Sequence, residues 1–186
     1  MSKQRIAPGE LEHVRRFVNT RQVRRDTDLL CDTAGIADWF AREGLTPGRV
    51  HATRGDVGHA IELREALRAV LAAHNGGGDV PVQASRTLDA AARRARLRVR
   101  FGDDGGASLV PEASGVDGAL GRLLAIVHDA IASGTWSRLK ACREHDCEWA
   151  FYDHTKNRSG AWCSMQACGN RAKARAFRER HAAPTT

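Results

Sequence analysis

The spacing of the cysteines constrains this chain more than any other feature. Four of the five cysteines form two pairs, Cys142 with Cys147 and Cys163 with Cys168. Four residues separate the members of each pair, and fifteen residues separate the pairs. Four thiolates are a common ligand set for structural zinc, and two tight pairs can surround the ion in a tetrahedron. The pattern therefore predicts one structural Zn²⁺ that closes a small module.

Other uses of these cysteines fit the sequence less well. The chain has no C-x-x-C redox motif, and two disulfides would need an oxidising compartment, for which no secretory signal is found. His145 and His154 could each replace a cysteine as ligand, but isolated histidines beside a finger are expected to face solvent. A four-thiolate site has no open position for a catalytic water, and no catalytic motif occurs elsewhere, so no enzymatic activity is expected.

The segment after the last cysteine, residues 171–180, is basic and alanine-rich and predicts a helix that leaves the zinc site. Its start beside the second pair would let the helix dipole stabilise the thiolates. With 3.6 residues per turn, Arg171, Arg175 and Arg178 share one face. Phe177 is expected to point back toward the rest of the protein. The three arginines would then face outward and contact phosphates, or guanine edges in a major groove.

The net charge of +7 is concentrated in this module. Between Arg138 and His181 ten Lys/Arg stand against five Asp/Glu, an excess of five. Four thiolates with Zn²⁺ would lower that excess to about three. A basic module favours nucleic acid as partner, although a solvated charged helix would explain the same charge. The remaining candidate nucleic-acid contacts are Lys173, Lys156 and Arg158, with Asn157 beside the last two.

The cysteine module resembles the CGNR zinc finger family, named for the tetrapeptide that reads Cys168-Gly169-Asn170-Arg171 here. Trp149-x-Phe151 and Asp153-x-x-Lys156-Asn157 also fit that family. In that family the finger follows an ABATE-type domain. The segment Phe17-Val18-Asn19-Thr20 of this chain resembles the opening of that domain. Residues 30–45 and 63–68 resemble later parts of that domain. The resemblance implies a stress-linked bacterial transcription regulator, with DNA as partner.

The residues before the finger predict a mostly helical domain, and the fold class is α+β, mostly α. Residues 1–136 would form this domain, and residues 137–181 a finger of the zinc-ribbon or treble-clef type. Strict alternation over Arg96–Phe101 predicts a half-buried strand in a hairpin with residues 107–110. Its arginines would guard a sheet edge or form a second polyanion contact. Apolar periodicity predicts helices from about Glu10, over Thr33–Glu43, over Asp56–His74, over Ser85–Arg94 and over Asp117–Ser133.

Several side chains are expected to be structural. Cys31 has no cysteine nearby and is expected to be buried, and Thr33 is expected to cap the helix that follows it. Ile131 continues the apolar stripe of the helix over 117–133. The arginine-rich residues 20–27 are expected to form a loop, and Asn170 to cap a helix or brace the zinc turn. The aromatic residues expected to pack around zinc are Trp149, Phe151 and Trp162.

Partners beyond DNA remain open at this stage. A protein-interaction module, with the basic helix docked on an acidic partner, and an RNA-binding factor fit the same charge. The N-terminal domain is expected to sense a small-molecule effector or to form a homo-oligomer, although no residue set points to a ligand. No run of eighteen apolar residues occurs, so no membrane span is expected, and the expected location is the cytoplasm.

Overall fold

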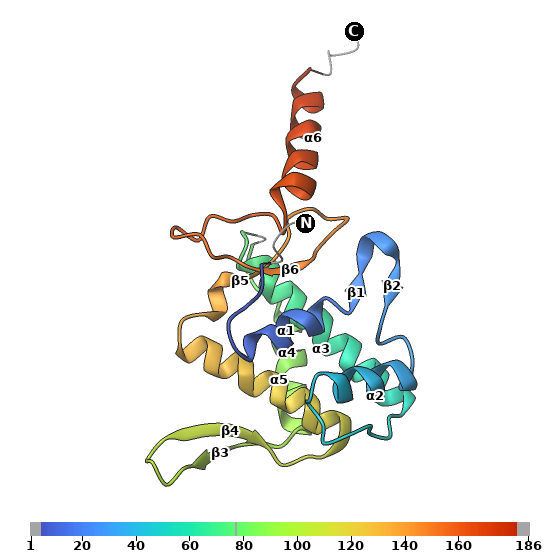
Figure 1. The fold of residues 1–186 in the computed structure, drawn as a ribbon, viewed down its shortest axis with the longest axis vertical. Coiled ribbons are helices and arrows are strands. Elements are labelled where there is room, and N and C mark those ends of the chain that lie inside the picture. Colours follow the sequence, from blue (N-terminus) through green and yellow to red (C-terminus); the bar gives the residue numbers. More distant parts are fainter. Residues whose placement is uncertain (1–4, 77, 182–186) are drawn as a thin grey trace.

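A computed structural model describes residues 5–76 and 78–181 of the chain. A helical body carries the cysteine module at one end, and a long hairpin leaves the other end (Figure 1). The helices are α1 (Leu11–Val18), α2 (Thr33–Arg42), α3 (Arg54–Ala73), α4 (Val82–Arg94), α5 (Gly115–Ala132) and α6 (Asn170–His181). The antiparallel ribbons pair β1 (Arg21–Gln22) with β2 (Thr27–Asp28), β3 (Leu97–Phe101) with β4 (Ala107–Pro111), and β5 (Leu139–Ala141) with β6 (Ala150–Tyr152). The fold is therefore α+β and mostly α, as predicted.

Local sequence explains where the helices begin. α3 opens with a capping box in which Thr53 and Asp56 satisfy each other's backbone N–H groups. The cap of α2 is Asp32, whose carboxylate accepts from Gly35 N at 2.7 Å, and not Thr33 as predicted. Asp32 is extended and one residue earlier, which is the geometry that a capping side chain needs.

The core lies between α1, α2, α3 and α5. It is built from aliphatic side chains with a small aromatic group, Phe17, Trp39 and Phe40, whose ring centroids are 5.4 to 6.4 Å apart. Burying each large apolar side chain contributes roughly 1.5–3 kcal/mol. The prediction that Ile131 belongs to this core is wrong, because it lies in the last turn of α5 and is 57% exposed.

The β3–β4 hairpin is not half-buried along its length. Leu97 packs against the core, but Val99 and Phe101 are 52% and 78% exposed. The tip of the hairpin extends past the end of the helical body (Figure 1), and the side chains toward the tip are the exposed ones. Alternation predicted the strand correctly and its burial wrongly.

The arginine-rich segment after α1 is a short ribbon and not a loop. β1 and β2 flank a 3₁₀ turn, η1 (Val23–Arg25), and Asp26 closes it in the left-handed region at φ 52°. Arg64 on α3 anchors its base by an ion pair to Asp28 at 2.6 Å. The ribbon is thereby fixed beside the cysteine module.

The helical body and the cysteine module share one core. Leu139, Ala141, Ala150 and Tyr152, from β5 and β6, are buried in the same cluster as the helices. The side-chain amide of Asn19 bonds to the backbone of Ala150 in the way that a neighbouring strand would. It donates to Ala150 O at 2.9 Å and accepts from Ala150 N at 2.7 Å. Asn19 is therefore structural, and it joins α1 to the edge of β6.

A second joint is made by α3. Arg68 is buried and donates to Glu148 O at 2.9 Å and to Val18 O at 2.8 Å, so one guanidinium ties α1, α3 and the cysteine module together. Asn75, just past α3, donates to Ala141 O at 2.7 Å and to Ala161 O at 2.9 Å. These bonds satisfy buried carbonyls that would otherwise be costly.

Replacing Asn19 by Ala should lower the free energy of unfolding by about 2–4 kcal/mol, because it strands a buried N–H and a buried C=O of Ala150. Denaturant unfolding of the zinc-loaded protein measures this. Asn157→Ala, an exposed asparagine on the loop between the cysteine pairs, is the matched control and should shift it by less than about 0.5 kcal/mol. Equal stability of the two variants would contradict the role given to Asn19.

Candidate metal centre

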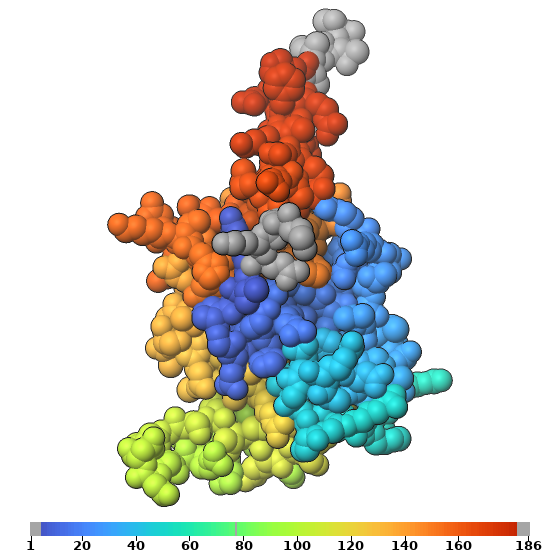
Figure 2. All heavy atoms as spheres, viewed as in Figure 1, coloured from blue at the N-terminus to red at the C-terminus, as the bar shows by residue number. Residues whose placement is uncertain are grey.

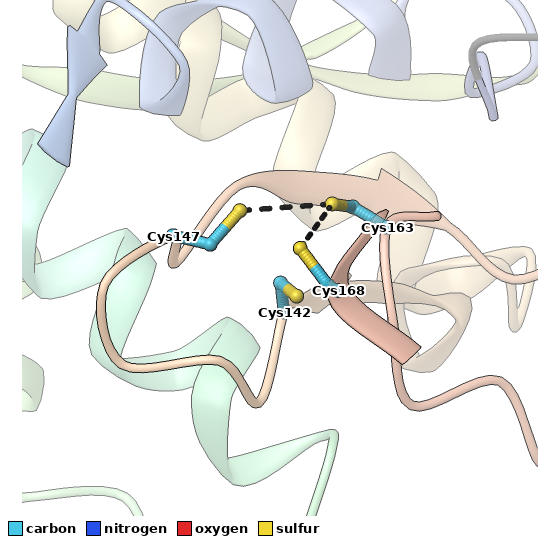
Figure 3. A group of neighbouring side chains, drawn as sticks. All are labelled: Cys142, Cys147, Cys163 and Cys168. Carbon is cyan, nitrogen blue, oxygen red and sulfur yellow. Dashed lines mark hydrogen bonds between the residues drawn. The ribbon is translucent and has the colours of Figure 1, made fainter. Parts of the chain in front are cut away.

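The four paired cysteines converge from separate turns on one point (Figure 3). Their sulfur atoms all lie within 4.8 Å of one another. Cys163 Sγ is 3.6 Å from Cys147 Sγ and 3.6 Å from Cys168 Sγ. Zinc–sulfur bonds of about 2.3 Å in a tetrahedron put sulfurs about 3.8 Å apart, whereas a disulfide needs about 2.05 Å. The geometry fits a zinc ion and not a disulfide.

The hydrogen bonds among the thiols also favour a metal site. A hydrogen bond with Cys147 raises the pKa of Cys142, and the bonds from Cys142 and Cys163 lower the pKa of Cys147. Close contact with Cys142 and Cys147 raises the pKa of Cys163 well above its ordinary value. Without metal, a thiolate at Cys147 is thus favoured beside protonated thiols at Cys142 and Cys163. A divalent cation that replaces the protons would stabilise all four as thiolates.

Two local structures present these sulfurs. Cys142 follows β5, and the turn to Cys147 is closed by Cys147 N donating to Glu144 O at 2.8 Å. In the second pair, Cys163 precedes a single π-helical turn, η3 (Met165–Gly169), and Cys168 lies within this turn, which leads into α6. Asn170 braces this turn by donating to Gln166 O at 3.1 Å, as predicted. One pair in a hairpin turn and one at a helix start correspond to the treble-clef alternative.

A buried ion pair shapes the loop between the two cysteine pairs. Lys140 Nζ lies 2.8 Å from Asp153 Oδ2, and both side chains are almost fully buried. Asp153 also accepts from Thr155 N at 3.0 Å and from Gly160 N at 2.7 Å. A Cβ on Gly160 would lie 2.7 Å from Asp153 Oδ1, so the approach requires glycine.

The titration of Asp153 follows from these contacts. Burial alone would raise its pKa, but Lys140 and the Thr155 and Gly160 hydrogen bonds outweigh burial and hold the pKa well below its ordinary range. Because the folded pKa is depressed, this carboxylate stabilises the fold at every pH above its unfolded value near 3.9. That contribution is lost only as the pH falls through the folded pKa.

The orientation predicted for α6 is wrong. Phe177 does not point back: it is 56% exposed and stacks on His181 with ring centroids 4.1 Å apart. Arg171 instead donates to Cys168 Sγ at 3.0 Å, and Arg175 pairs with the buried Glu144 at 2.9 Å. A carboxylate and a thiolate attract the arginines more strongly than the module's small apolar surface attracts Phe177.

The other predicted nucleic-acid contacts lie on the surface of the molecule. Arg178, Lys173 and Lys156 are exposed and make no ion pair within residues 5–76 and 78–181. Arg158 is exposed and donates to Ser137 Oγ at 3.0 Å. Their role as nucleic-acid contacts stays a prediction.

The aromatic and cysteine predictions hold in part. Phe151 and Trp162 pack against the cysteine cluster, but Trp149 is not part of it. Cys31 is exposed, contrary to the prediction, because it lies in the turn before α2 and not on its buried face. The residues that sequence reasoning missed, Lys140, Glu144 and Arg68, are charged side chains buried by partners distant in sequence. Arg68 stood at the end of the family-like segment 63–68, but nothing in that resemblance indicated its burial.

Comparison with known protein families agrees with this geometry. The model of the ABATE family, described as "Putative stress-induced transcription regulator", matches residues 14–135, which is more than half of the chain. The chain belongs to the ABATE family. The model of the CGNR zinc finger matches residues 138–181, so the cysteine cluster is that finger and can hold one zinc ion. Neither description names an enzyme. No curated protein matches the sequence.

Cysteine substitutions test the zinc site directly. Purified ABATE protein should contain one zinc per chain, and Cys147→Ser should lose most of it, because three thiolates leave one tetrahedral position to water. Cys31→Ser is the matched control and should keep its zinc. Metal content by mass spectrometry or a colorimetric chelator measures both, and equal zinc in the two variants would contradict the assignment.

The Arg175–Glu144 pair should stabilise the CGNR finger. The Arg175 guanidinium donates a hydrogen bond to the Glu144 carboxylate and holds its pKa below the ordinary value, so Arg175→Ala leaves a buried carboxylate without its cation. We expect a melting temperature several degrees lower in that variant. Arg178→Ala, on the same helix, should melt like the wild type, and thermal unfolding that ranks the two the other way would refute the role of Arg175.

Proposed function

We propose that this ABATE protein is a DNA-binding transcription regulator in which the finger and α6 contact DNA. The observation that carries the proposal is the exposure of α6: none of its residues, all of which the structure describes, is buried. The helix projects from the finger with solvent around it (Figure 2). A lone helix of this length is only marginally stable in water, so a partner that covers it would stabilise it.

The charge of α6 favours a polyanion as that partner. Arg171 and Arg175 are held by the finger, whereas Lys173, Arg178 and Arg180 make no ion pair within the described residues; of these we take Lys173 and Arg178 as the phosphate contacts. Lys156 and Arg158 on the loop between the cysteine pairs would extend the contact. Arg171 and Arg175 orient the helix and add positive charge, and they contact DNA only where their remaining N–H groups reach it. The zinc is structural, and a cytoplasmic location suits this role.

We divide the chain into a regulatory unit, residues 1–136, and the finger, residues 137–181, with the first sensing a small molecule or forming a homo-oligomer. A cavity of about 540 Å³ lies between α3 and the first cysteine turn and supports sensing. Its lining includes Arg68, Ala72 and Arg143, so a ligand there would touch both units. The exposed apolar face of the β3–β4 hairpin supports self-association.

One observation favours a second candidate, a helix that docks on an acidic protein. Phe177 is exposed in the middle of α6, and a projecting aromatic side chain is typical of protein–protein anchors. A protein complex that survives nuclease treatment would support this candidate.

Binding of a fluorescent 25-base-pair duplex across a salt series tests the DNA proposal. The affinity should fall steeply with salt, and Lys173→Ala and Arg178→Ala should each lower the slope of log affinity against log salt by about one. Arg100→Ala, on the hairpin at the far end of the molecule (Figure 1), is the charge-matched control and should leave the slope unchanged.

The outcomes separate the candidates. No binding at low salt would refute the DNA proposal. Preferential displacement of the duplex by RNA of equal length would replace it by RNA binding. If Lys173→Ala and Arg178→Ala bind the duplex like the wild type and the Arg100→Ala control, α6 does not contact the DNA.

A further inference from the structure

We infer that the DNA-contacting surface includes the N-terminal unit, through a phosphate-binding groove between the β1–β2 ribbon and the finger. This inference rests on the proposed function and extends it to residues outside the finger. A groove of about 440 Å³ separates the two parts. Its lining combines both units: Gln22, Val23, Arg24, Arg25, Cys147 and Trp149.

Two cations of the ribbon remain without a carboxylate. The acidic residues beside them are used elsewhere, Asp26 by Arg21 at 2.6 Å and Asp28 by Arg64 at 2.6 Å. Arg24 and Arg25 are exposed and form no ion pair in the described part of the chain. Adjacent unpaired guanidinium groups that line a groove are suited to phosphate oxygens, which they can bind in a bidentate manner.

The ribbon holds these arginines in place. η1 fixes their backbone, Asp26 N donates to Val23 O at 3.2 Å, and Leu29 N donates to Thr20 O at 3.0 Å across the base. Burial alone would lower the pKa of Arg24, but the nearby sulfurs of Cys168, Cys147 and Cys163 raise it, so its side chain lies close to the zinc site. A preformed cationic site loses little side-chain entropy when phosphate binds.

Trp149 lines the groove on the side of the finger, opposite the ribbon. This side chain is half-buried and stands apart from the aromatic cluster at the cysteines. Beside two arginines, an indole offers an apolar surface that can pack on a sugar while the guanidinium groups bind the phosphates next to it. The β1–β2 ribbon, which forms one wall of the groove, stands at the end of the helical body from which α6 projects (Figure 1). One duplex that lies along α6 would therefore pass near it.

The test is duplex binding by the full-length, zinc-loaded protein, with Arg25 as the varied position because Arg24 also lies close to the zinc ligands. Arg25→Ala should weaken binding roughly threefold to tenfold and lower the salt slope by about one, and Arg25→Glu should do more. Arg100→Ala and Arg100→Glu are the matched controls at the far end of the molecule. All four variants should keep one zinc per chain and the wild-type melting temperature.

Each result decides the matter. Wild-type binding with Arg25 variants that match the Arg100 variants would overturn the groove and leave the proposed function standing. Absence of wild-type binding at low salt would overturn both. Equal losses for Arg25→Glu and Arg100→Glu would show a general charge effect and overturn the groove.

Discussion

The finger depends on its burial against the helical body. On its own it has a very small core, in which Phe151 and Trp162 pack on the cysteines. Its hairpin joins the main core of the protein, and Asn19 and Arg68 bond its backbone. Zinc and this interface therefore stabilise the same strands from two sides. A finger held in this way is fixed in orientation, and so is the helix that leaves it.

The same constraint decides what each arginine near the zinc site does. Four thiolates around Zn²⁺ carry a net charge of −2, and Glu144 adds another buried negative charge. Arg171 and Arg175 contact these charges and fix α6 beside the centre, and Arg24 lies near them. Arg178 and Arg25 form no ion pair in the described part of the chain, which is why we propose them as contacts to an external polyanion. On this proposal, position relative to the zinc, and not residue type, separates structural from contacting arginines.

The sequence predicted what local rules control. Cysteine spacing predicted the cluster, and periodicity predicted the helices and the hairpin within a few residues. Burial was predicted less well, because it depends on partners far along the chain: Phe101 and Ile131 extend beyond the helices that would cover them. The orientation of α6 failed for a related reason. A helical wheel places Phe177 and Arg175 on different faces, but only the fold brings Glu144, 31 residues away, to Arg175.

The FVNT motif positions the arginine-rich ribbon that follows it. Asn19 and Thr20 end the recognisable FVNT motif, and both are buried as joints: Asn19 with β6 and Thr20 with Arg64. These joints fix where the next residues stand, and those residues reach the zinc site. The ribbon is anchored to α3 at Asp28, and Arg24 places a cation near the cysteine cluster. The groove beside Trp149 thus has one wall from the ribbon and one from the finger, so its shape depends on how these joints hold the two parts together.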